Sequence, residues 1–244
     1  MHALLTAALT VLYPHRCLGC GVYDTLHLHF CTTCQRFLRR VQAPLCTSCG
    51  LPFAENVGPD HLCVRCRTQR PAFRKARAWA LYHTGGATPQ PLSEAIQHFK
   101  YQRRLSTGRA LADLAAAFFP LAEEHYDLAV PVPLHLDRLR WRGFNQSLLL
   151  AQAIGHARQI PVDPFLLERI RPTAPQTQLN ERERSANVRG AFAVQNTARL
   201  KEKTVLLIDD VYTSGSTVNE CARVLRRAGA AAVDVFTLAR AVPH

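Results

Sequence analysis

The chain has 244 residues, of which 48% are hydrophobic and 20% charged, and its thirty Lys and Arg against eighteen Asp and Glu leave a formal charge of +12 at pH 7. These proportions are typical of a folded globular protein and exclude a disordered tail or a fibre. The length allows one full core and a small additional module, and the basic excess favours anionic partners.

The first predicted element is the apolar stretch from Ala3 to Leu12. It is too short to cross a bilayer, which takes about 20 apolar residues, and it lacks the basic start and the small-residue cleavage site of a secretory signal. We expect a docking helix that ends near Pro14, because the residue before a proline is pushed out of the helical region. We do not expect the protein to be embedded in a membrane.

Four Cys-x-x-Cys pairs come next. Two such turns offer four sulfurs in the tetrahedral arrangement that structural Zn²⁺ prefers, so we predict two structural zinc sites. Their ligands are Cys17, Cys20, Cys31, Cys34, Cys46, Cys49, Cys63 and Cys66. Disulfides are the alternative, which the absence of a secretory signal disfavours. We favour neighbouring pairs that share a metal, which gives two ribbons in series, over alternating pairs, which would give an interleaved module.

The cysteine-rich segment also carries most of the excess charge. Up to Arg77 we count ten basic and three acidic residues, a net +7. Basic grooves with exposed aromatic side chains hold single-stranded nucleic acid without sequence preference. We therefore predict contact with single-stranded DNA, weakened by charge removal at Arg39, Arg40 or Arg74. The alternative is that the phenylalanines of this segment fill the thin core of the ribbons; they are Phe30, Phe37, Phe53 and Phe73.

Beyond this module the pattern changes. We place the boundary near Lys75, which gives a zinc-binding module over residues 1–75 and an α/β domain over residues 76–244, and Gly85-Gly86 marks the passage between them. Strand and helix patterns then alternate, which predicts a mostly parallel sheet flanked by helices. The expected strands are 76–83, 127–132, 165–170, 203–208 and 233–238, and the expected helices are 91–101, 107–124, 147–158 and 217–227.

The stretch from Val205 to Thr217 is the most specific local signal. Four apolar residues suit a buried strand, Asp209 and Asp210 follow, and a small polar loop then opens a helix. The free N–H groups of a helix N-terminus face a phosphate, and Gly215 lets the backbone approach it closely. The loop adds hydroxyl donors from Thr213, Ser214, Ser216 and Thr217. We predict a sugar-phosphate site, with the carboxylates accepting hydrogen bonds from ribose hydroxyls.

The nine residues from Asp209 to Thr217 closely resemble the phosphoribosyl-pyrophosphate (PRPP) loop of type I phosphoribosyltransferases. Other segments narrow the resemblance to the ComF family, in which a double zinc ribbon precedes a domain of that fold. These segments are the cysteine-rich head, Lys100-Tyr101, Val130-Pro131-Val132-Pro133, Arg142-Gly143-Phe144-Asn145-Gln146, and the pattern of Gln178, Leu179, Arg182, Arg184 and Asn187 before Gly190. Together they span nearly the whole chain.

The resemblance implies further site residues. The loop after the 127–132 strand, followed by Arg138 and Arg142, would hold the diphosphate of PRPP, because guanidinium forks bind phosphate oxygens bidentately. Lys100 would reach the same anion from another side. The alternative for these arginines is that they form a solvated basic face without a bound anion. Residues 169–189 would form a hood that closes over the substrate and brings Arg182 or Arg184 to the phosphates. A plain surface loop is the alternative there.

The implied reaction is loss of pyrophosphate from C1 of PRPP with attack by an unidentified acceptor, with Mg²⁺ bridging diphosphate and ribose oxygens. Asp209 and Asp210 would hold the ribose and offset the positive charge that grows at C1. The resemblance further implies a role in natural transformation, in the cytoplasm beside the DNA-uptake machinery.

Three functions follow. The first is a Mg²⁺-dependent phosphoribosyltransferase, and the second is a non-catalytic competence factor that binds single-stranded DNA. The third is a PRPP sensor whose loop keeps binding after catalysis has lapsed.

Overall fold

The computed structural model of the protein describes residues 15–24, 29–55, 57–83, 89–101, 105–173 and 181–242, without the side chains of His15, Glu181 and Arg182. The expected docking helix from Ala3 to Leu12 and the Gly85-Gly86 passage lie outside these residues. Among the residues that are described, no helix is long and apolar enough to cross a membrane.

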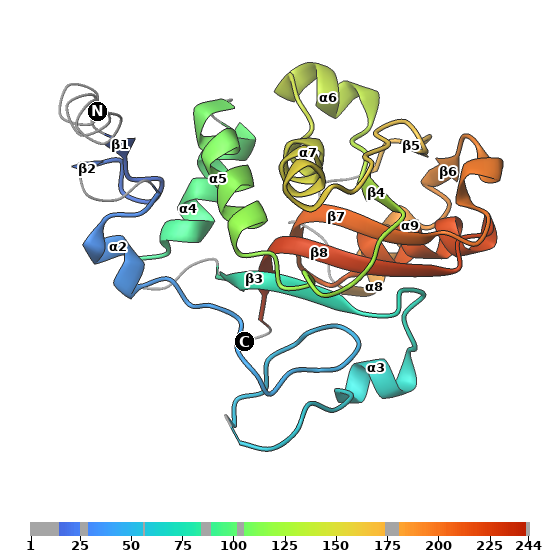
Figure 1. Cartoon of the computed structure of the whole chain (residues 1–244), viewed down its shortest axis with the longest axis horizontal. Coiled ribbons are helices and arrows are strands. Elements are labelled where there is room, and N and C mark those ends of the chain that lie inside the picture. Colours follow the sequence, from blue (N-terminus) through green and yellow to red (C-terminus); the bar gives the residue numbers. More distant parts are fainter. Residues whose placement is uncertain are drawn as a thin grey trace.

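A four-stranded parallel sheet forms the centre of the molecule (Figure 1), in the order β3, β8, β7, β4. The strands are β3 (Ala76–Tyr82), β4 (Leu128–Pro131), β7 (Thr204–Tyr212) and β8 (Ala232–Ala241). The two inner strands, β7 and β8, are buried on both faces, as their nearly continuous apolar sequences predict. The predicted parallel sheet flanked by helices is confirmed.

Helices cover both faces of this sheet. The face beneath α4, α5 and α7 packs Ile208, Phe236 and Leu238 against them, and the opposite face packs Leu207 and Val235 against α9. The helices of the domain are α4 (Pro91–Tyr101), α5 (Leu105–Ala117), α6 (Leu136–Arg142), α7 (Gln146–Arg158), α8 (Glu181–Val188), α9 (Ser216–Arg227) and the 3₁₀ helix η2 (Thr197–Leu200). Because β7, α9 and β8 follow one another in the chain, they form a βαβ unit with the polar loop at the start of α9.

Some predicted elements differ from the observed ones. The 203–208 strand continues to Tyr212, because its pairing with β8 extends to Tyr212 opposite Arg240. The carboxylates therefore lie within the end of the strand and not after it. The 107–124 helix ends at Ala117, shortly before Pro120, which cannot continue a helix. The 165–170 strand is β5 (Leu167–Arg169), which pairs antiparallel with β6 (Phe192–Val194) outside the main sheet. Helix α6 was not predicted.

The two cysteine-rich ribbons contact the domain at different places (Figure 1). The first ribbon, residues 15–38, contains β1 (His15–Arg16), β2 (Tyr23–Asp24) and α2 (Thr32–Arg36) and packs on α4. The second ribbon, residues 45–68, contains α3 (Val64–Thr68) and packs near β3 and Tyr212. Both contacts need glycine, since a Cβ on Gly19 would lie 2.5 Å from Pro91 Cβ and one on Gly50 would lie 2.4 Å from the Ala76 oxygen.

The segment between the ribbons covers the outer edge of the sheet. Arg40 forms an antiparallel bridge with Ala80 of β3, and the flanking hydrogen bonds run from Val41 N to Trp79 O at 3.1 Å and from Leu81 N to Arg39 O at 2.7 Å. An uncovered edge strand is a template for pairing with another chain. The module thus protects the sheet as well as binding metal.

Arg74 fixes the junction between module and domain. Its Nε and Nη2 donate to the two carboxylate oxygens of the fully buried Asp234 at 2.9 and 2.6 Å. Tyr126 Oη donates to the same carboxylate at 2.9 Å, and Glu124 accepts from both Arg74 and Lys75. The hydrogen bond to Asp234 raises the pKa of Arg74. Arg74, which we had expected to contact DNA, is the counterion of a buried carboxylate.

Replacing Arg74 by methionine keeps an apolar stem of similar length but leaves the Asp234 carboxylate buried with Tyr126 as its donor. We expect the free energy of unfolding of the zinc-loaded protein to fall by about 3 kcal/mol, the lower end of the cost of breaking a buried ion pair, as measured by urea denaturation. Arg67→Met, at an exposed position of α3, is the matched control. An equal free energy of unfolding in the two variants would show that the Arg74 guanidinium does not stabilise the buried Asp234 carboxylate.

Candidate functional site

Three predicted site residues, Asp209, Asp210 and Lys100, meet at the carboxyl ends of the parallel strands, where ligands of such sheets bind. Asp209 and Asp210 end β7, and Lys100 comes from the last turn of α4. Lys100 Nζ lies 2.9 Å from Asp210 Oδ2. Ser147, in the first turn of α7, donates its hydroxyl to Asp209 Oδ1 at 2.9 Å. Three elements that are distant in sequence therefore form one charged cluster.

The Asp209 carboxyl group has a strongly perturbed pKa. Burial and the neighbouring charge of Asp210 raise the pKa of Asp209 to about 7. The backbone N–H of Asp210 also donates to Asp209 Oδ1 at 2.9 Å, which fixes that carboxylate. Burial disfavours the charged form of Lys100, but the Asp210 carboxylate outweighs it and the pKa of Lys100 is raised. Asp209 is thus the group of this cluster that exchanges a proton near neutral pH.

The polar loop after β7 is a tight turn that depends on a glycine. Gly215 has φ of 76°, and a Cβ there would lie 2.2 Å from the hydroxyl oxygen of Tyr212, so no other residue fits. Ser214 and Ser216 are buried and their hydroxyls lie 2.9 Å apart. Thr213 is exposed and Thr217 is half-buried. The loop leads directly into α9, and Ser216 N at the start of this helix donates to Ser214 Oγ at 3.4 Å.

Tyr212 connects this loop to the second ribbon. The guanidinium carbon of Arg240 lies 4.3 Å from the centre of the Tyr212 ring. The same guanidinium donates from Nη1 to Cys49 O at 2.5 Å and from Nη2 to Cys49 Sγ at 3.4 Å. Burial raises the pKa of Tyr212 to about 12, so its hydroxyl stays neutral. The sequence analysis predicted neither the contact of Arg240 with Cys49 nor its contact with Tyr212. A single arginine in a strand carries no local signal of such a contact.

Basic side chains surround the carboxylates. Arg142 and Arg169 are buried, and burial lowers the pKa of each. Their Nε atoms find no hydrogen-bond acceptor among the described residues. Arg138 Nη2 donates to the Thr173 oxygen at 3.3 Å, and Arg169 donates to the Thr173 hydroxyl. These contacts place two guanidinium groups beside Thr173.

The remaining predicted arginines come from the 169–189 stretch. Arg184 lies half-buried on α8, and the side chain of Arg182 lies outside the described residues. Arg171 Nη2 donates to Asn187 O at 3.0 Å and to Arg189 O at 2.9 Å, which ties the two ends of the stretch together.

Asn145 holds the loop after β4 against α7. Its Oδ1 accepts from Ser147 N at 3.0 Å, which caps the helix, and its Nδ2 donates to Val132 O at 3.0 Å. Phe144 stacks on Phe99 with ring centres 5.1 Å apart, as a packing anchor. We missed the roles of Asn145 and Ser147, although an asparagine just before a helical pattern is a recognisable cap.

The cysteines form two clusters, and in each the sulfur atoms lie within 4.8 Å of one another. The Sγ atoms of Cys20 and Cys31 are 3.7 Å apart, and those of Cys49 and Cys63 are 3.8 Å apart. A tetrahedral site with Zn–S bonds of about 2.3 Å requires a sulfur separation of roughly 3.8 Å, so zinc fits both clusters. Neighbouring pairs share each site, which confirms the arrangement in series. The members are Cys17, Cys20, Cys31 and Cys34 in the first and Cys46, Cys49, Cys63 and Cys66 in the second.

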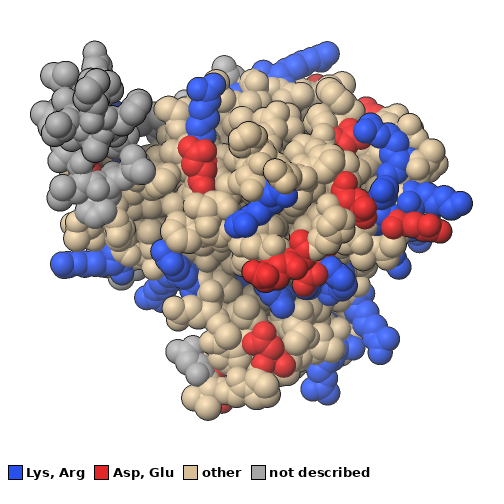
Figure 2. All heavy atoms as spheres, in the orientation of Figure 1, with Lys and Arg blue, Asp and Glu red and all other residues tan. Residues whose placement is uncertain are grey.

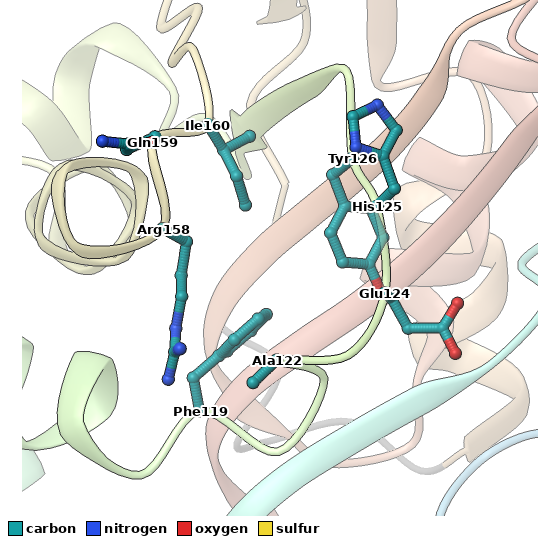
Figure 3. A pocket seen from close by; sticks show the side chains of 8 residues that line it. All are labelled: Phe119, Ala122, Glu124, His125, Tyr126, Arg158, Gln159 and Ile160. Atoms are coloured by element: carbon teal, nitrogen blue, oxygen red, sulfur yellow. The ribbon is translucent and has the colours of Figure 1, made fainter.

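A small cavity of about 120 Å³ lies away from this site (Figure 3). Glu124, His125 and Tyr126 line it from the segment before β4, and Arg158 lines it from the end of α7. It therefore lies at the amino ends of the strands, opposite the carboxylates. Two of its polar groups, Glu124 and Tyr126, belong to the junction around Asp234.

Comparisons with known proteins agree with both halves of the chain. Residues 8–67 match a double zinc ribbon domain and residues 129–242 match a phosphoribosyl transferase domain. The DNA utilization protein YhgH of Salmonella typhimurium is 36% identical over 219 residues, which cover 88% of this chain and 91% of that protein.

Two relatives have names that refer to competence. Competence protein F of Haemophilus influenzae is 31% identical over 238 residues, 94% of this chain and 98% of that protein. Competence protein ComFC of Bacillus subtilis is 26% identical over 212 residues, 86% of this chain and 83% of that protein. The chain therefore belongs to the ComF family, with a double zinc ribbon joined to a type I phosphoribosyltransferase fold.

Proposed function

We propose that this protein binds PRPP at the carboxyl end of β7 and acts in natural transformation as a phosphoribosyltransferase of a still unassigned acceptor. The observation that carries the proposal is the meeting of the Asp209 and Asp210 carboxylates with Lys100 and the loop around Gly215. The competence names of two relatives support the biological role. On this proposal the protein works on the cytoplasmic side, beside the DNA-uptake machinery, with residues 1–75 and 76–244 as its two parts.

Each part of PRPP has a matching group. The N–H groups and hydroxyls of the loop from Thr213 to Thr217 would bind the 5′-phosphate. Asp209 and Asp210 would accept hydrogen bonds from the ribose hydroxyls. Lys100, Arg138 and Arg142 would hold the diphosphate and stabilise the negative charge that it gains on leaving. Arg182 and Arg184 on α8 would approach when the 169–189 stretch closes.

Magnesium fits this site as an ion shared with the substrate. The site offers two carboxylates, and Mg²⁺ in proteins is commonly held by one or two carboxylates together with substrate phosphates and water. When bound, the ion would neutralise diphosphate charge and so favour its departure. The protein's own part is to fix the ribose, to balance the positive charge at C1 with Asp209 and Asp210, and to exclude water.

The double variant Asp209→Asn/Asp210→Asn tests the proposed PRPP site. Each substitution replaces a charged acceptor by a neutral one, and together they should raise the dissociation constant of PRPP by roughly 100-fold or more, about 3 kcal/mol. The measurement is calorimetry on the zinc-loaded protein with Mg²⁺. Asp113→Asn, at an exposed position of α5, is the matched control. Unchanged PRPP affinity in the double variant would remove the carboxylates from the site.

Pyrophosphate release separates an enzyme from a PRPP sensor. With saturating PRPP, a screen of bases and amines that yields pyrophosphate identifies an acceptor. Tight PRPP binding with no release from any acceptor supports the sensor.

The raised pKa of Asp209 gives PRPP binding a defined pH dependence. Because this pKa is about 7 in the free protein and ribose hydroxyls favour the ionised carboxylate, binding should release a proton below pH 7 and tighten as the pH rises from 6 to 8. Calorimetry in two buffers of different ionisation enthalpy measures the proton release. The Asp209→Asn variant measures the proton release that comes from the phosphates of PRPP alone. Equal proton release in both proteins would show that Asp209 is not the group that loses the proton.

Contact with single-stranded DNA is the second candidate function, and exposed arginines next to the first ribbon favour it. Arg36, Arg39 and Arg40 are exposed, and Phe37 is 37% exposed. Figure 2 shows Lys and Arg side chains spread over this face, several of them around the module below the sheet. Phe30 and Phe73 are buried and fill the ribbon cores, so they cannot stack on bases.

DNA binding of this kind should depend steeply on salt. For Arg39→Gln/Arg40→Gln we expect the slope of log K against log salt concentration to shrink by about 1.4, because each contact with a single strand contributes about 0.7. Fluorescence anisotropy with a labelled oligothymidylate between 50 and 300 mM salt gives the slope. Arg227→Gln, at the exposed end of α9, is the control. A slope near zero for the unaltered protein would exclude this function.

A further inference from the structure

A cavity next to the proposed site extends from the phosphate loop toward the zinc module. It has a volume of about 1110 Å³ and lies between the second ribbon and its continuation to Phe73, the loop from Thr213 to Ser216, and α8. Asp209, Asp210 and Lys100 are not among its lining residues. The cavity therefore shares the loop with the PRPP site but lies on the side away from the ribose-binding carboxylates.

Four arginines and three predicted zinc ligands, Cys49, Cys63 and Cys66, contribute to the lining of this cavity. The arginines are Arg65, Arg70, Arg189 and Arg240, and the lining contains no Asp or Glu. Arg240 is only 6% exposed, and its Nε–H finds no acceptor among the described residues. Its two terminal nitrogens already bind Cys49, where they offset thiolate charge. A buried donor without a partner costs free energy unless a ligand or water supplies an acceptor, which points to an anion in this cavity.

The size of the cavity exceeds what one phosphate needs. Pockets for small molecules usually measure about 300–1,000 Å³, and a 5′-phosphate fills a small part of that volume. Leu51 and Pro71 add apolar surface beside the arginines. Arg65 lies near the Tyr212 ring, since its charge contributes to lowering the pKa of Tyr212 against the effect of burial. A ligand that reaches from the loop to Arg65 and Arg70 must therefore extend beyond its 5′-phosphate.

We propose that this cavity is a second anion subsite, for a ribosyl ligand whose 5′-phosphate is bridged to another phosphate group. The loop would hold the first phosphate, Arg65 and Arg70 the second, and the apolar surface the nucleoside attached to it. A diphosphate ester such as ADP-ribose and the phosphodiester of a short polynucleotide share this chemistry. The inference rests on the proposed function, because it takes the loop as the phosphate site.

Calorimetry on the zinc-loaded full chain tests the subsite with three probes: ribose 5-phosphate, ADP-ribose and the 5′-phosphorylated dinucleotide pTpT. We expect ADP-ribose, pTpT or both to bind at least tenfold more tightly than ribose 5-phosphate. The ratio of the dissociation constants should fall to about one in Arg65→Gln/Arg70→Gln. It should persist in Arg67→Gln, which alters an exposed arginine of the same helix that does not line the cavity.

The outcomes separate the two proposals. A gain for ADP-ribose alone identifies a nucleotide ligand, and a gain for pTpT alone identifies a polynucleotide end. Bridged ligands that bind no more tightly than ribose 5-phosphate, or a gain that survives in Arg65→Gln/Arg70→Gln, would overturn the subsite. If neither PRPP nor ribose 5-phosphate binds, the proposed function fails. The subsite would then stand only if a bridged ligand binds in a manner that depends on Arg65 and Arg70.

Discussion

The contact of Arg240 with Cys49 is the constraint on which the loop geometry depends. Parallel pairing of β7 with β8 sets Arg240 opposite Tyr212, and the guanidinium lies against both the Tyr212 ring and a predicted zinc ligand. Tyr212 in turn leaves room only for a glycine at position 215. Because hydrogen bonds to ligand sulfurs help to orient metal sites, metal binding in the second ribbon and the shape of the phosphate loop are linked through one side chain.

The carboxylate cluster shows how a buried anionic site is kept without a ligand. Burial, together with the charge of the adjacent Asp210, raises the pKa of Asp209 at the end of this buried strand. Lys100 and the hydroxyl of Ser147 oppose this rise, one with charge and the other with a hydrogen bond. A cationic or hydroxyl-rich ligand would relieve what remains of the repulsion between the two carboxylates.

Features encoded locally could be predicted from the sequence, and features that depend on tertiary contacts could not. The cysteine spacing predicts both zinc clusters and favours their arrangement in series, and the apolar run with the following polar loop predicts β7 and the start of α9. No local pattern marks Arg240, which meets Cys49 across most of the chain, or the pairing of Arg74 with Asp234. Composition alone suggests that Arg74 is one of many surface charges. Its structural role follows from its contact with the buried Asp234 carboxylate.

The two ribbons support different halves of the proposed site. The first packs on α4, where Gly19 meets Pro91, and α4 ends in the turn that carries Lys100. The second packs on the opposite face of the sheet, where it contacts Tyr212 and lines the cavity with arginines. A metal-held module needs little apolar core of its own, so it can present charged side chains beside a buried loop. A module of this size that was held together by a hydrophobic core would need apolar side chains at many of those positions. Zinc ligation leaves the positions available for charged side chains.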